Sequence, residues 1–218
     1  FIASVIAVPA RGMAQITHPL TAGLFNSNAM KEVEELYKRS SLNLSIISGF
    51  LLVIIICNLN EFYQMMPPET RIAVPVVFLI ALTKFSENIL GSNNAILYNS
   101  DLFKVTLWMG IVLTMVAIVL NWLLIPEFGI QGAAIATCTA YLCYAFAKAY
   151  YVFLKLNIHP WTSKTWQALF LIAGITGVFY FWDFSWHPVV NIAVKSTLIS
   201  LIYLFSVYKL KLSTEINH

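Results

Sequence analysis

Apolar segments long enough to cross a membrane follow one another along almost the whole chain of 218 residues. A spanning helix needs about 20 mostly apolar residues. Hydrophobic residues make up 59% of the chain and charged residues only 11%, whereas soluble domains carry about 25% charged residues. The expected fold class is therefore an all-α, polytopic transmembrane helix bundle, with helices near residues 1–24, 42–59, 72–98, 103–125, 130–155, 165–182 and 188–208.

The connections between these segments are short. Residues 26–41 carry mixed charges and predict an amphipathic helix in a cytoplasmic loop. No connection is long enough for a catalytic domain, so we do not expect an enzyme. The predicted organisation is a bundle over residues 1–160, followed by two accessory helices and a short tail over 161–218. Because Phe1 lies inside an apolar run without the order of a signal peptide, the chain is expected to be the C-terminal part of a longer protein.

Lysine and arginine are distributed unevenly between alternate connections, and cytoplasmic loops are enriched in both. The connections after the first, third and fifth helices, together with the C-terminus, hold Lys31, Lys38, Arg39, Lys104, Lys148, Lys155, Lys164, Lys209 and Lys211, and the opposite connections hold Arg71. This bias predicts that the first helix starts outside and that the C-terminus is cytoplasmic. The basic residues do not form the clusters that nucleic acids require, so we expect no nucleic-acid partner.

The three cysteines, Cys57, Cys138 and Cys143, all lie in apolar stretches and lack the spacing of a metal site. We interpret them as small packing residues rather than as disulfide or metal ligands. The sequence indicates no cofactor.

The first helix carries a polar stripe. Arg11, Gln15 and His18 are spaced at i, i+4 and i+7, which places them on one helical face. A charged side chain within a membrane costs at least about 2.5–3.5 kcal/mol on insertion scales. We interpret the stripe as a cationic wall for an anionic substrate group. The alternative is a polar face buried against another part of the protein.

The third helix carries polar residues at helical spacing as well. Lys84 and Glu87 are at i and i+3 and can neutralise each other; alternatively, Lys84 contacts phosphate and Glu87 binds a coupling proton or sodium ion. Asn88 and Asn94 are candidates for contacts with sugar hydroxyls or for stabilising a break in the helix. Lys195, near one end of the last helix, is expected to extend to the lipid headgroups.

The most specific motif runs from Asn121 to Thr137. Pro126 ends one helix and Gly129 turns the chain. Small side chains then recur at helical spacing, so that a neighbouring helix can approach closely. The motif residues are Asn121, Pro126, Gly129, Gly132, Ala133, Ala136 and Thr137.

This motif, an Asn, a Leu-Ile-Pro turn and Gly-x-x-Gly-Ala-Ala-x-Ala-Thr, resembles the C-terminal signature of polysaccharide biosynthesis and export proteins. These are the oligosaccharide-lipid flippases of the multidrug/oligosaccharidyl-lipid/polysaccharide exporter superfamily. The stretch from His18-Pro19-Leu20 to Arg39 is similar to a cytoplasmic segment of their second lobe. Such proteins commonly have fourteen helices in two six-helix lobes plus two extra helices, so the resemblance implies that this chain is the second lobe with the two extra helices.

The resemblance further implies transport of a polyprenyl-diphosphate-linked oligosaccharide by alternating access. Substrate contacts would come from Arg11, Gln15, His18, Lys84 and Asn94, with Glu87 as the ion-coupling candidate. The expected partners are this lipid-linked substrate, membrane lipids and the N-terminal lobe. Alternatives are an ion-coupled multidrug exporter of the same fold and, less favoured, a polytopic glycan-assembly enzyme. A seven-helix retinal protein fits poorly, because Lys195 lies near one end of its helix and Glu87 has a lysine neighbour.

Overall fold

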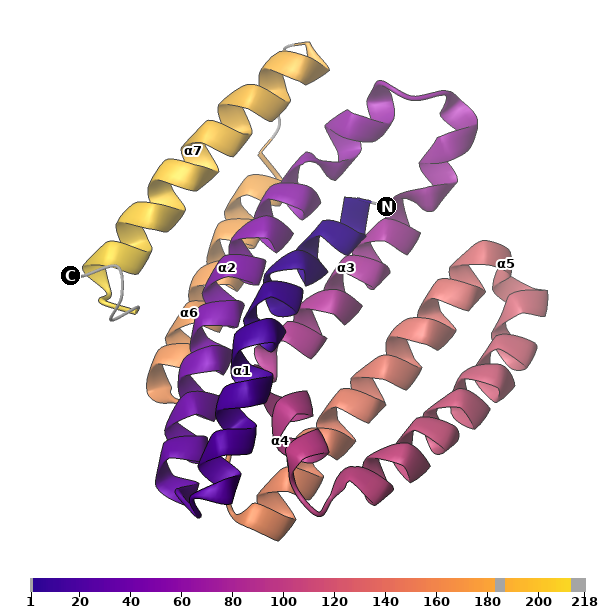
Figure 1. Cartoon of the computed structure of the whole chain (residues 1–218). Coiled ribbons are helices and arrows are strands. Elements are labelled where there is room, and N and C mark those ends of the chain that lie inside the picture. Colours follow the sequence, from indigo (N-terminus) through magenta and orange to yellow (C-terminus); the bar gives the residue numbers. More distant parts are fainter. Residues whose placement is uncertain (1, 183–186, 213–218) are drawn as a thin grey trace.

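A computed structural model describes residues 2–182 and 187–212, apart from the side chains of residues 71 and 72, and this part of the chain is all-α (Figure 1). It contains α-helices and two 3-10 helices, and no strand occurs within it. The elements in chain order are η1 (Ile2–Ala7), α1 (Val8–Asn26), α2 (Met30–Gln64), η2 (Pro68–Ala73), α3 (Val74–Ile89), α4 (Asn93–Asn99), α5 (Phe103–Leu156), α6 (Ser163–Tyr180) and α7 (Pro188–Lys209). The predicted fold class is confirmed.

Three helices, α2, α5 and α7, are long and apolar enough to cross a membrane, and the bent pair of α3 and α4 makes a fourth if it counts as one span. Successive passes of the chain run in opposite directions through the bundle (Figure 1). Large apolar side chains such as Trp108, Met115 and Trp122 are exposed on the first half of α5. Apolar surface of this extent is stable only against lipid or another protein. The chain is therefore a membrane protein.

The amphipathic segment 26–41 is helical over most of its length, but it is not a separate loop element. It continues without interruption into the next predicted helix, and the two together form the 35-residue α2. No Gly or Pro occurs between Met30 and Ser48 to stop the helix. Two i,i+4 ion pairs, Lys38 with Glu34 and Arg39 with Glu35, support its first turns.

Helix α5 is a hairpin of two arms (Figure 1). The break lies at Gly129, whose backbone angles of φ 55° and ψ −132° are not helical. Just beyond the turn the arms approach so closely that a Cβ atom on Gly132 would lie 2.1 Å from the carbonyl oxygen of Leu124. The expectation that Pro126 ends a helix is wrong, because Pro126 lies within the first arm and the helix continues to the break at Gly129. Asn121 donates to the carbonyl of Ala117, and Thr137 donates to the carbonyl of Ala133. Ala136 is buried.

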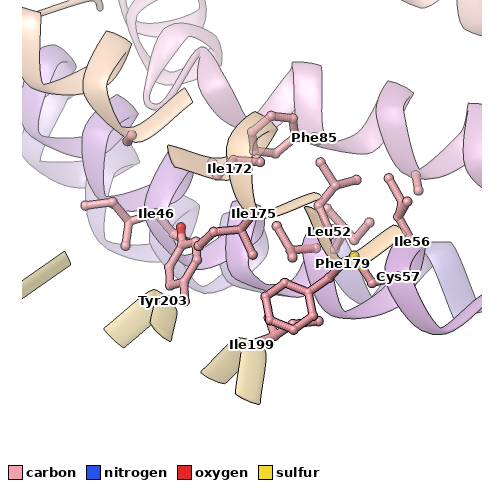
Figure 2. Close-up of a cluster of buried hydrophobic side chains, with 14 of the residues drawn as sticks. Ile46, Leu52, Ile56, Cys57, Phe85, Ile172, Ile175, Phe179, Ile199 and Tyr203 are labelled. Atoms are coloured by element: carbon pink, nitrogen blue, oxygen red, sulfur yellow. The ribbon is translucent and has the colours of Figure 1, made fainter. Parts of the chain in front are cut away.

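The main hydrophobic core surrounds α2, which packs against α1, α3, α6 and α7. Figure 2 shows Ile46, Leu52 and Ile56 of α2 beside Ile172 and Phe179 of α6, together with side chains from α3 and α7. The hydroxyl of Tyr203 on α7 donates to the backbone carbonyl of Ile46 at 2.8 Å. The two helices predicted as accessory thus share a core with the rest of the bundle. The boundary predicted near residue 160 lies in the connection between α5 and α6, and residues 183–186 and 213–218 of the predicted C-terminal part lie outside the described residues.

The expectation that Lys195 extends to the lipid headgroups is wrong. Its side chain is 3% exposed and forms an ion pair with Glu61, which is equally buried on α2. Its ammonium group also donates to the carbonyl of Cys57 at 3.4 Å. The physical reason is that α7 packs on α2 along the face that carries Lys195, so the side chain reaches a carboxylate before it reaches the membrane surface.

Candidate functional site

A cleft of about 320 Å³ opens between α1, α3 and α4, with α2 behind it. We call it the polar cleft. It is lined by Ala7, Ala10, Arg11, Met13, Ala14, Thr17, His18, Leu44, Lys84, Glu87, Asn88, Gly91, Ser92, Asn94 and Ala95. Two stretches that are far apart in the sequence, one around Arg11 and one around Glu87, therefore form a single site.

Most of the residues proposed from the sequence meet in this cleft. Arg11, His18, Lys84, Glu87 and Asn94 all line it. Gln15 does not: it is exposed on α1 and is absent from the cleft wall. The helical stripe predicted for α1 is thus divided. Gln15 lies about 40° from Arg11 around the helix axis, on the side opposite to Ala14 and His18, which line the cleft.

Arg11 is a cation of the cleft whose side chain is not held by any other described side chain. Its side chain is exposed, and within the described part of the chain it has no hydrogen-bond or ion-pair partner. The alanines at positions 7, 10 and 14 line the same cleft with small side chains. A guanidinium presents several donors in a planar fork, which suits bidentate contact with a phosphate or carboxylate.

Lys84 and Glu87 form an ion pair within α3, with Nζ and Oε2 3.2 Å apart, and both side chains are about 30% exposed. The Lys84 ammonium also lies 5.4 Å from the centre of the Tyr141 ring on α5, within the range of a cation–π contact. The mutual neutralisation expected from the i,i+3 spacing is therefore present. With Arg11 unpaired, the lining residues carry two cations and one carboxylate, a net charge of +1 with His18 neutral.

His18 lines the cleft and contacts α4. Its ring stacks on that of Tyr98, with centroids 6.1 Å apart and an angle of 21° between the planes. The amide of Asn99 donates to the His18 backbone carbonyl at 2.9 Å. Pro19, the next residue, lies inside α1 and has no N–H to donate to the carbonyl of Gln15 one turn earlier. The contacts of His18 with Tyr98 and Asn99 hold this part of α1 against α4.

The bend between α3 and α4 brings Asn94 to the cleft. The two helices are inclined by 56°, and Gly91 at the break has φ +55°. A Cβ atom at this position would lie 2.4 Å from the backbone nitrogen of Ser41, so only glycine fits here. Asn88, one turn earlier, donates to the carbonyl of Ile6 at 2.6 Å and thereby ties α3 to η1.

Lys148 is a residue that the sequence interpretation misplaced. Counted as a basic residue of a cytoplasmic connection, it instead lies in the second arm of α5 with 5% of its surface exposed. Its ammonium donates to Oδ1 of Asn94 at 3.0 Å and lies 4.4 Å from the centre of the Tyr144 ring. The signal that could have found it is its distance of eight residues from the end of the helix at Leu156.

The described residues include no group of three or more His, Cys, Asp or Glu side chains arranged to hold a metal ion. Cys57 and Cys138 are buried and Cys143 is exposed, and all three are free thiols. The polar groups that line the cleft are a guanidinium, an ammonium, a carboxylate, an imidazole, two amides and two hydroxyls.

Comparison of this chain with protein-family models, with curated proteins and with solved structures finds no match.

Proposed function

We propose that this chain forms part of a membrane transporter and that the polar cleft binds the anionic group of a lipid-linked substrate. The observation that supports the proposal is the unpartnered Arg11 guanidinium in a cleft whose lining residues have a net positive charge. A charged side chain within the membrane is costly unless it faces water or an opposite charge, and Arg11 is exposed at the cleft without a partner among the described residues. A substrate phosphate would supply that negative charge.

The substrate class follows from combining this chemistry with the resemblance of the Asn121–Thr137 motif. The flippases that the motif resembles transport oligosaccharides linked to a polyprenyl diphosphate. In the proposed arrangement, Arg11 contacts the diphosphate directly. Lys84 contributes only a weaker long-range attraction, because its ion pair with Glu87 neutralises much of its charge. Asn94 offers its amide to the diphosphate or to the first sugar.

The same proposal includes the setting of the protein. The chain would lie in the cytoplasmic membrane of the cell with its C-terminus in the cytoplasm, in line with the uneven distribution of lysine and arginine. The remaining wall of the path would come from the N-terminal lobe that the resemblance implies. Movement of the substrate would be alternating access without covalent chemistry, which distinguishes this function from that of a glycan-assembly enzyme.

The test is replacement of Arg11 in the intact protein. Arg11→Ala should abolish complementation of a flippase-deficient strain and weaken binding of polyprenyl diphosphate by about tenfold or more, the loss typical of a hydrogen bond to a charged group. Arg11→Lys should retain part of both, because it keeps the charge but loses the planar fork. Membrane abundance is measured alongside, so that loss of function is separated from loss of protein.

Arg39→Ala is the matched control. Arg39 is another exposed arginine, it pairs with Glu35 on α2, and it lies outside the polar cleft. Normal surface glycan in the Arg11→Ala strain would refute the proposal. Binding of organic cations by the wild-type protein, without binding of the diphosphate, would favour the multidrug exporter instead.

A further inference from the structure

Lys148 and Asn94 join two helices behind the polar cleft. Lys148 lies in the second arm of α5 and is buried, whereas Asn94 lies in α4, is exposed and lines the cleft. The Lys148 ammonium donates a hydrogen bond to Oδ1 of Asn94 at 3.0 Å. Over the described ranges, no carboxylate lies within ion-pair distance of Lys148.

This contact determines which way the Asn94 amide faces. A lysine ammonium carries only donors, so the atom that it contacts has to be the amide oxygen. The amide nitrogen keeps both of its N–H groups, and it has no hydrogen-bond partner in the part of the chain that the structure describes. With a positive charge held on its oxygen, the Asn94 side chain offers a ligand hydrogen-bond donors.

We infer that Lys148 is a positioning residue that makes Asn94 a dedicated donor to the oxygens of a phosphate group in the polar cleft. The inference rests on the proposed function and assigns part of its specificity: acceptor oxygens are favoured, and a ligand group that has only donors is rejected. The Lys148 charge acts in the same direction, because its close contacts are a neutral amide and a neutral aromatic ring. The Glu87 carboxylate also acts on the Lys148 charge from a distance, but it is paired with Lys84. An anion bound at Asn94 therefore adds the negative charge that the close contacts of Lys148 lack.

A purely structural role for the contact makes a different prediction, namely that the bond only ties α5 to α4. Asn94→Asp separates the two roles. A carboxylate at this position keeps the contact with Lys148 and turns it into an ion pair, so a structural tie survives. The same change removes both N–H groups and adds a negative charge facing the cleft, so donation to phosphate is lost.

The experiment measures binding of polyprenyl diphosphate to the intact protein in lipid nanodiscs, together with thermal stability. Asn94→Asp should retain or raise the melting temperature and weaken binding by about tenfold or more. Lys148→Met should weaken binding and reduce the preference for the diphosphate over the uncharged polyprenol. Lys148→Arg should keep both the affinity and the preference close to those of the wild type, because arginine can also donate to the amide oxygen. Lys155→Met removes an exposed lysine from the same helix and should bind as wild type does.

The outcomes distinguish this inference from the proposal beneath it. Failure of the wild-type protein to bind the diphosphate overturns both. If the wild type binds and Arg11→Ala does not, but Asn94→Asp and Lys148→Met bind as tightly as the wild type, the proposed function stands and the role of Lys148 is refuted. Should Lys148→Met fail to fold, Asn94→Asp decides alone, since it keeps the inter-helix contact.

Discussion

Lys195 on α7 forms an ion pair with Glu61 on α2, and each side chain is only 3% exposed. The pair lies where the last helix docks on the central one, and the neighbouring amide of Asn58 donates to the hydroxyl of Ser196 at 3.1 Å. Polar contacts of this kind cannot be replaced by water inside a lipid bilayer. The position of α7 therefore depends on a match between particular residues as well as on apolar packing.

Breaking this pair on one side should destabilise the protein strongly. Lys195→Met leaves the Glu61 carboxylate buried without its counter-ion, a change that typically costs about 3–5 kcal/mol. We expect a large fall in the melting temperature of the detergent-solubilised protein. The double variant Glu61→Gln with Lys195→Met removes both charges and should recover much of the loss. Lys209→Met, at the exposed end of α7, is the control. Equal melting temperatures for Lys195→Met and the control would contradict this view of the pair.

The bend between α3 and α4 should depend on Gly91. In Gly91→Ala the added methyl group meets the Ser41 backbone, and the left-handed backbone conformation alone costs about 1–3 kcal/mol. We expect lower thermal stability and weaker diphosphate binding, because Asn94 moves with the bend. Gly110→Ala, where nothing lies within 4 Å of the added atom, should be neutral or slightly stabilising. A Gly91→Ala protein with wild-type stability and binding would show that the bend tolerates a side chain.

The two arms of the α5 hairpin should move apart when a side chain is added at Gly132, where the arms approach closely. Gly132→Ala places a methyl group against the carbonyl oxygen of Leu124, so the two arms have to separate. The change is measurable as a longer distance between spin labels at Val119 and Ile135, with Cys143 replaced to avoid its labelling. Gly174→Ala, on α6, has open space around it and serves as the control. An unchanged distance between the labels in Gly132→Ala would show that the close approach of Gly132 to Leu124 does not set the separation of the arms.

Glu87 should weaken anion binding in the wild-type protein. Glu87→Gln releases Lys84 from its ion pair and raises the formal charge of the cleft lining from +1 to +2, as Arg11 and Lys84 then have no opposing carboxylate. We expect tighter binding of polyprenyl diphosphate and a steeper decrease of affinity with salt. The measurement is a titration at low and high ionic strength. Transport that falls and loses its dependence on pH or sodium would instead assign Glu87 an ion-coupling role.

Local sequence patterns were enough to predict that the apolar segments are helical and to predict part of the site, but not the break of the segment 72–98 at Gly91. The spacing of Arg11 and His18 predicted a shared face, and both residues line the polar cleft. The i,i+3 spacing of Lys84 and Glu87 allowed the ion pair that the structure shows, which was one of two interpretations left open by the sequence. These relationships hold within one helix, where the period of the helix determines which side chains are neighbours.

Contacts between helices were beyond the reach of the same patterns. Lys148 and Asn94 are 54 residues apart, and Lys195 and Glu61 are 134 apart. The eight residues between Lys148 and the end of α5 place this lysine inside the helix. Nothing in the sequence near either lysine identifies the residue on another helix that it contacts. The sequence also could not show that Gln15 lies outside the cleft, because its spacing fits the polar stripe of α1.

The sequence by itself determined that this chain is a helical membrane protein, because the length and apolar character of its segments leave lipid as the solvent for most of its surface. Only the tertiary structure decided which polar side chains meet. The rotation of each helix about its axis is set by packing against its neighbours, and that rotation brings Lys195 to Glu61 and Lys148 to Asn94.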